Sequence, residues 1–132
     1  MQNIYDLEIF SGIEKDIVDE ILKSSKIERF SFGEYVILQG DESNGKGYII
    51  KSGEVLVEIN NQEIKKLSTG EIFGEIALLN EEQRVASIKV ISENAEFLIL
   101  SQDDLIEMVN NGSELINKNI MQRLEENLKN NY

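Results

Sequence analysis

Two residues of opposite charge, Glu75 and Arg84, mark the stretch of this sequence whose residue types and spacing are suited to chemistry. An arginine guanidinium can grip two phosphate oxygens through parallel hydrogen bonds, and an ionised glutamate can accept hydrogen bonds from a hydroxyl group. The two residues are nine positions apart, so both can face one ligand if the intervening loop folds back. An anion site beside a hydroxyl acceptor predicts a site for a sugar phosphate.

The backbone around Glu75 supports the same interpretation. Residues 75–79 are good helix formers, although they suffice for only about one turn. The first N–H groups of such a turn have no partner within the helix and suit an anion, and Gly74 lets a ligand approach the backbone closely. The alternative is a structural ion pair between Glu75 and Arg84. Such a pair would need neither the glycine, nor the turn, nor the strand predicted after Arg84.

Composition narrows the classes of function. The sequence contains neither histidine nor cysteine, which excludes imidazole catalysis, histidine-based metal sites, disulfides and thiolate zinc sites and makes an enzyme the least expected class. Its 25 acidic and 13 basic residues give a net charge of −12, which disfavours binding to nucleic acid or an anionic membrane. No apolar run has the ~18 residues of a spanning helix and no signal peptide is recognisable, so we expect a cytoplasmic protein.

Hydropathy patterning divides the 132 residues, which we expect to form one domain, into three regions. Residues 1–25 are predicted to be helical, with a capping box formed by Ser11 and Glu14 ahead of an apolar stripe. Over residues 26–100, short apolar runs with a period of two are separated by turn residues, which predicts many short antiparallel strands. Two phenylalanines of this region, Phe73 and Phe97, are expected in the core.

The last region, residues 101–132, is predicted to form two helices. Ser101 is expected to cap the first of them, and an apolar stripe on the second is expected to pack on the core or to form a dimer interface. The region holds six acidic and three basic residues and so offers no basic surface for DNA. The predicted fold class is therefore mainly β with flanking helices.

Motifs along the whole sequence resemble those of the cyclic-nucleotide-binding domain family, as in the catabolite activator protein and the regulatory subunits of protein kinase A. Residues 73–88 read F-G-E-I-A-L, then, after a short loop, R-V-A-S-I, and resemble the phosphate-binding cassette of that family. Residues 33–41 resemble its G-E-x-[VI]-[IV]-x-x-G-[DE] motif, residues 51–57 its G-x-[VI]-x-V hairpin, and residues 7–13 its entry helix. The resemblance implies a jelly-roll (double-stranded β-helix) β-roll.

The resemblance also implies a role for each matching residue. Glu75 would accept a hydrogen bond from the ribose 2′-hydroxyl, and Arg84 would pair with an exocyclic phosphate oxygen. The backbone N–H groups of Ala77 and Val85 would bind the phosphate, and Gly74 would let the ribose approach. The ligand would be a cyclic nucleotide, with no metal and no other cofactor.

The base would lie against Ile76, Val85 and Ala86, which the resemblance implies as the lining of the pocket. Members of the family that bind cGMP tend to carry threonine or serine directly after the arginine, where a hydroxyl meets the guanine edge. This sequence has Val85 there, so we predict cAMP in preference to cGMP, although the hydroxyl of Ser87 is close in sequence.

The resemblance implies a sensor or adaptor that signals by moving its C-terminal helices. In that family, the transcription regulators continue into a helix-turn-helix after the long helix. This sequence runs to Tyr132, so we expect the partner to be another protein or a second copy of this chain. Leu124, Leu128 and Tyr132 are alternative residues to cap the base. A scaffold or dimerisation module without nucleotide, and a sensor of another small anion, are the competing functions. The presence of both Glu75 and Arg84 counts against them.

Overall fold

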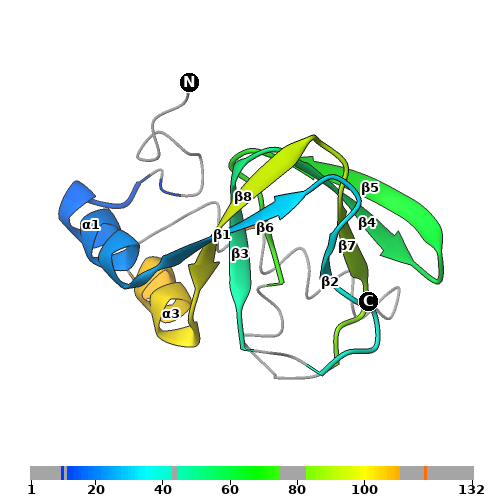
Figure 1. Cartoon of the computed structure of the whole chain (residues 1–132). Coiled ribbons are helices and arrows are strands. Elements are labelled where there is room, and N and C mark those ends of the chain that lie inside the picture. Colours follow the sequence, from blue (N-terminus) through cyan, green and yellow to red (C-terminus); the bar gives the residue numbers. More distant parts are fainter. Residues whose placement is uncertain (1–9, 11, 43–44, 75–82, 111–117, 119–132) are drawn as a thin grey trace.

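The structure is a computed structural model, and it describes residues 10, 12–42, 45–74, 83–110 and 118. In the order shown in Figure 1, helix α1 (Lys15–Ser24) precedes the strands and helix α3 (Gln102–Asn110) follows them. The strands are β1 (Lys26–Ser31), β2 (Tyr35–Ile37), β3 (Gly47–Ser52), β4 (Glu54–Ile59), β5 (Gln62–Ser68), β6 (Ile72–Phe73), β7 (Ser87–Val90) and β8 (Asn94–Leu100). The mainly β fold with flanking helices is confirmed, while the predicted second C-terminal helix lies outside the described residues.

The described strands form two four-stranded antiparallel sheets, ordered β1-β8-β3-β6 and β2-β7-β4-β5. The pairings are nested: β1 pairs with β8, β2 with β7, β3 with β6 and β4 with β5. A long hairpin that is rolled up on itself has this pattern, which is that of a jelly roll. The nesting places the β2–β3 connection, the end of β6 and the approach to β7 close together.

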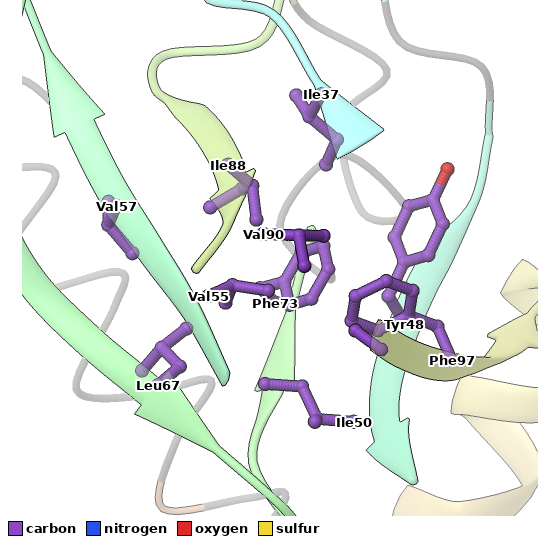
Figure 2. Packing of buried hydrophobic residues seen from close by; sticks show 11 residues of the cluster. Ile37, Tyr48, Ile50, Val55, Val57, Leu67, Phe73, Ile88, Val90 and Phe97 are labelled. Carbon is purple, nitrogen blue, oxygen red and sulfur yellow. The ribbon is translucent and has the colours of Figure 1, made fainter. Parts of the chain in front are cut away.

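One core lies between the two sheets and is shown in Figure 2. Its centre is aromatic, because the rings of Tyr48 and Phe73 stack with their centroids 5.0 Å apart and Phe97 meets both edge-on. Phe73 and Phe97 are almost completely buried, as predicted. The remaining members of this core are Ile37, Ile50, Val55, Val57, Leu67, Ile88, Val90 and Ala95. We call this cluster the roll core.

A second core lies between the other face of the first sheet and the two helices, which pack beside each other in Figure 1. It consists of Phe10, Val18, Ile21, Ile49, Ile72, Leu98, Leu100 and Met108, and we call it the helix-side core. The alternation along β8 explains how one strand serves both cores, since Phe97 points into the roll and Leu98 toward the helices. None of the helices within the described residues is long and apolar enough to cross a membrane.

The helix ends test two local predictions. The capping box predicted at Ser11 and Glu14 is wrong, because α1 begins at Lys15 and Glu14 itself is the N-cap, without a side-chain capping bond. Gly12 has a φ of +84°, which a right-handed helix does not allow, and so no helix can pass through it. At α3 the predicted cap is confirmed: the Asp104 N–H donates to Ser101 Oγ (3.1 Å), and the Ser101 N–H donates to Asp104 Oδ2 (3.0 Å).

Two tight turns shape the roll. Between β3 and β4, Gly53 has a φ of +101°, and a Cβ on it would lie 2.7 Å from the carbonyl oxygen of Asn94, so only glycine fits. Between β4 and β5, Asn60 and Asn61 have φ values of +53° and +65°. Two consecutive residues with positive φ form the hairpin turn whose twist matches that of the strands, and asparagine tolerates this conformation well.

Candidate functional site

The Arg84 side chain is directed into the roll and is only 7% exposed. Its Nη1 donates to the carbonyl oxygen of Gly74 at 3.1 Å, and its Nη2 donates to the carbonyl oxygen of Lys46 at 2.8 Å. These acceptors come from the end of β6 and from the connection between β2 and β3. A buried cation is costly unless polar groups surround it, so the two carbonyls hold the guanidinium in one orientation inside the fold.

The backbone of Arg84 is fixed as well. Its N–H donates to the carbonyl oxygen of Asp41 (2.8 Å), and its own carbonyl oxygen accepts from the Gly40 N–H (2.8 Å). This reciprocal pair joins Arg84 to the turn that follows β2, much as two strands are joined. The residue that the sequence singled out is therefore anchored at both its main chain and its side chain.

Gly74 has a φ of +78°, a conformation that residues with a side chain rarely adopt. A Cβ at this position would lie 3.1 Å from Arg84 Nη1 and 3.4 Å from both Ile37 Cδ1 and the Lys46 carbonyl oxygen. The sequence predicted that this glycine opens the backbone to a ligand. Within the protein itself, the space beside it is taken by the arginine.

The other predicted site residues fall into two groups. Glu75, Ile76 and Ala77 lie outside the described residues. Val85 and Ala86 lead from Arg84 into β7, and they differ in environment: Val85 is 46% exposed, while Ala86 is half-buried and packs against the roll core. An exposed apolar residue directly beside a buried arginine is available to contact a ligand.

Among the described residues, the ion pair nearest in sequence to the acceptors of Arg84 involves Lys46, whose carbonyl oxygen accepts from Arg84. Lys46 Nζ lies 3.8 Å from Glu28 Oε1, and both side chains are partly exposed. The described carboxyl groups with shifted pKa values are elsewhere: Arg29 hydrogen-bonds to Glu96 and lowers its pKa, and a hydrogen bond with Glu20 raises the pKa of Glu107. No group of three or more acidic, histidine or cysteine residues that could hold a metal occurs in the part of the chain described.

Sequence reasoning missed the groups that hold Arg84. The carbonyl oxygens of Gly74, Lys46 and Asp41 and the N–H of Gly40 are main-chain groups, which every residue type except proline carries in full. Residue identity therefore gives no direct signal for them. The one available indication is that Gly40 and Asp41 end the family motif matched at residues 33–41.

The comparison with known families agrees with this geometry. The model of the family described as the cyclic nucleotide-binding domain matches residues 27–111, which is well over half of the chain. The chain belongs to the cyclic-nucleotide-binding domain family. The resemblance noted in the sequence is thereby confirmed, and the matched segment includes the β-roll except for the first residue of β1, together with Arg84.

Relatives of this cyclic-nucleotide-binding domain are parts of larger proteins. The cGMP-dependent protein kinase of Eimeria tenella is 32% identical over 114 residues, which cover 86% of this chain and 11% of the kinase. The cAMP-dependent protein kinase type II regulatory subunit of Drosophila melanogaster is 28% identical over 89 residues, which cover 67% of this chain and 23% of that protein. The chain thus spans only a small part of the length of the curated relatives it matches.

Solved structures share the fold. The cAMP-bound regulatory subunit PfPKA-R superposes with a TM-score of 0.79 at 21% identity, covering 96% of this chain and 43% of that one. The catabolite activator protein of Thermus thermophilus superposes with a TM-score of 0.71 at 26% identity, covering 92% of this chain and 58% of that one. The cyclic-nucleotide-binding β-roll is therefore established, and its relatives include proteins named for each of the two nucleotides.

Proposed function

We propose that this domain is a non-catalytic sensor that binds a cyclic nucleotide, cAMP in preference to cGMP, through Arg84 and Glu75. Arg84 pairs with the phosphate and Glu75 accepts from the ribose hydroxyl. The domain reports binding by moving its C-terminal helices, which a protein partner or a second copy of the chain would contact.

The placement of Arg84 is the observation that carries this proposal. Arg84 is 7% exposed as a residue, and because two carbonyls hold its guanidinium, the side chain has already lost most of its conformational freedom. Binding a phosphate then requires little further ordering of the side chain, which favours affinity.

The preference for cAMP rests on Val85. Val85 is an exposed residue directly after the arginine, and it has no hydroxyl to offer a guanine. The hydroxyl of Ser87 already accepts a hydrogen bond from the N–H of Gln39 at 2.9 Å. That bond uses only one acceptor position of the Ser87 hydroxyl, so the missing hydroxyl at Val85 alone carries the proposed preference for cAMP.

Signalling through the helices is supported by three consecutive residues at the end of β6. Ile72 belongs to the helix-side core, which it shares with Met108 of α3, and Phe73 belongs to the roll core. Gly74, the next residue, accepts the hydrogen bond from Arg84. A ligand that shifts the guanidinium therefore acts on a backbone segment that is packed against the helices only two residues away.

Isothermal titration with cAMP and with cGMP tests the proposal, using the wild type, Arg84→Ala and Arg29→Ala. Arg29 is a matched control, because its loss changes the charge equally while its side chain is 79% exposed and pairs with Glu96 on a different part of the surface. A hydrogen bond to a charged group contributes about 1.5–3 kcal/mol, so we expect Arg84→Ala to weaken cAMP binding about 10- to 100-fold. Arg29→Ala should bind as the wild type does.

The opposite result is equally informative. Folded, nucleotide-free protein that gives no heat with either nucleotide would overturn the sensor function and favour a scaffold with the same fold. Equal affinity of the wild type and Arg84→Ala for cAMP would show that Arg84 does not bind the nucleotide.

A further inference from the structure

The turn that holds the backbone of Arg84 is itself held in place through Gln39. Its Oε1 accepts from the backbone N–H of Asn60 at 2.8 Å, and its Nε2 donates to Asn60 Oδ1 at 3.0 Å. The N–H of Gln39 also donates to Ser87 Oγ at 2.9 Å. Gln39 therefore ties the β2–β3 connection to two places, the tip of the β4–β5 hairpin and the first residue of β7.

Asn60 is a firm anchor for this contact. It lies in the two-residue turn between β4 and β5, with its φ of +53° set by the hairpin. Strand β4 is paired on both sides, with β5 and with β7. The tip of the hairpin is thus positioned by the second sheet, and it presents one donor and one acceptor to the amide of Gln39.

Burial does little to hold the turn in place. Leu38 is 49% exposed, and Gln39, Gly40 and Asp41 are all exposed. Segments with few buried apolar contacts take their position from their hydrogen bonds and open easily without them. Among the described residues these bonds are the contacts of Gln39, the Gly40–Arg84–Asp41 backbone pair, and the bond from the Asp41 N–H to the Leu38 carbonyl oxygen (3.1 Å) within the turn itself.

We propose that Gln39 is a positioning residue for nucleotide binding. It clamps the 39–41 turn to the hairpin, and the turn then fixes the backbone of Arg84 at the distance from which its guanidinium reaches the carbonyls of Gly74 and Lys46. The proposal rests on the proposed function, since it takes Arg84 as the residue that binds phosphate. Gln39 itself touches no ligand.

The first test replaces Gln39 by alanine, with Gln62→Ala as the matched control. Gln62 is an exposed glutamine at the start of β5 in the same hairpin. Two neutral hydrogen bonds lost at an exposed position correspond to about fivefold in an equilibrium constant. We expect titration calorimetry to show cAMP binding weakened by about that factor in Gln39→Ala, with Gln62→Ala unchanged and the melting temperatures of all three proteins similar.

Hydrogen exchange provides a readout that does not depend on nucleotide. The N–H groups of Gly40 and Arg84, which form the reciprocal pair, should exchange faster in Gln39→Ala, whereas the Phe97 N–H inside β8 should keep its protection. If the wild type bound no nucleotide, the proposed function would fail while this exchange pattern would still decide whether Gln39 positions Arg84. Faster exchange at all three amides would indicate a general loss of stability and would refute a positioning role.

Asn60→Gly completes the test as a double-mutant cycle. Glycine keeps the positive φ and the backbone N–H but removes the Oδ1 acceptor. We expect Asn60→Gly to weaken cAMP binding less than Gln39→Ala does, and to add nothing in the Gln39→Ala background. Additive losses would mean that the two side chains act independently, and wild-type affinity together with wild-type exchange in Gln39→Ala would overturn the proposal.

Discussion

Substitution of Gly74 by alanine probes the site most directly, because it adds one methyl group next to the guanidinium. Alanine in a left-handed conformation costs about 1–2 kcal/mol, and Gly74 has a φ of +78°. The new Cβ would lie 3.1 Å from Arg84 Nη1, so the guanidinium must move by a few tenths of an ångström. Weakening one charged hydrogen bond by about half adds roughly 1 kcal/mol. We expect the free energy of unfolding to fall by about 2–3 kcal/mol in total.

Gly33→Ala separates the two contributions. Gly33 has a similar φ of +86°, but a Cβ there meets nothing within 4 Å. Its substitution should therefore carry only the cost of the backbone conformation. The difference between the two variants then measures the disturbance of Arg84, about 1 kcal/mol, which corresponds to about fivefold in cAMP affinity.

The assays are urea unfolding followed by circular dichroism and calorimetric titration with cAMP. Equal losses of stability in Gly74→Ala and Gly33→Ala, together with equal affinity for cAMP, would refute the contact between Gly74 and the guanidinium. A loss of affinity in Gly33→Ala as large as that in Gly74→Ala would show that the effect does not come from the site.

Three further predictions concern the turn, the helices and the base. Gly53→Ala should lower the free energy of unfolding, measured by urea unfolding, by about 3 kcal/mol. The backbone has a φ of +101° there, and the new Cβ would overlap the carbonyl of Asn94. A loss of stability smaller than that of Gly33→Ala would contradict this prediction. The hydrogen bond with Glu20 raises the pKa of Glu107 above its ordinary value of 4.5, so its stabilisation is complete at low pH and lost as the pH rises through the raised pKa. Glu107→Gln should therefore melt higher than the wild type at pH 7, with the gap closing toward pH 4.5, and a gap independent of pH would exclude this cause. Val85→Thr should raise cGMP affinity about three- to tenfold in calorimetry by supplying a hydroxyl. An unchanged cGMP affinity would show that the residue at position 85 does not contact the base.

Local patterns predicted the local structure where nothing overrode them. Ser101 caps α3 as expected, because the cap requires only its hydroxyl and the N–H of Asp104 three residues on. The capping box at Ser11 failed because Gly12 takes a positive φ, which residue type permits but does not require. A capping pattern predicts a helix only if the residues inside it remain helical.

Strands were predictable in proportion to their burial. The sequences of β4 and β8 show alternating or continuous apolar residues, because one or both faces of these strands are buried. β5 is the edge strand of the second sheet and buries only Leu67 of its seven residues, so its sequence carries almost no periodic signal. β6 has two residues and forms by pairing with β3, which no local pattern indicates.

The sequence proposes the side chains of the candidate site but not the scaffold that positions Arg84. Arg84 and Gly74 could be named from their residue types and spacing. The groups that hold the guanidinium are carbonyls located 10 and 38 positions away in the sequence. Contacts over such separations depend on the nested pairing of the strands, and they become visible only once the roll is assembled.

The sharing of β8 between two cores has a consequence for how the molecule comes apart. Phe97 and Leu98 are adjacent, yet one is packed in the roll and the other under the helices. Releasing the helices would expose one face of the strand that the roll also needs, and opening the roll would remove the surface on which the helices rest. Neither the roll core nor the helix-side core stays covered when the other one opens. The described parts of the domain should therefore melt in a single cooperative transition, and a change that stabilises one core should stabilise both.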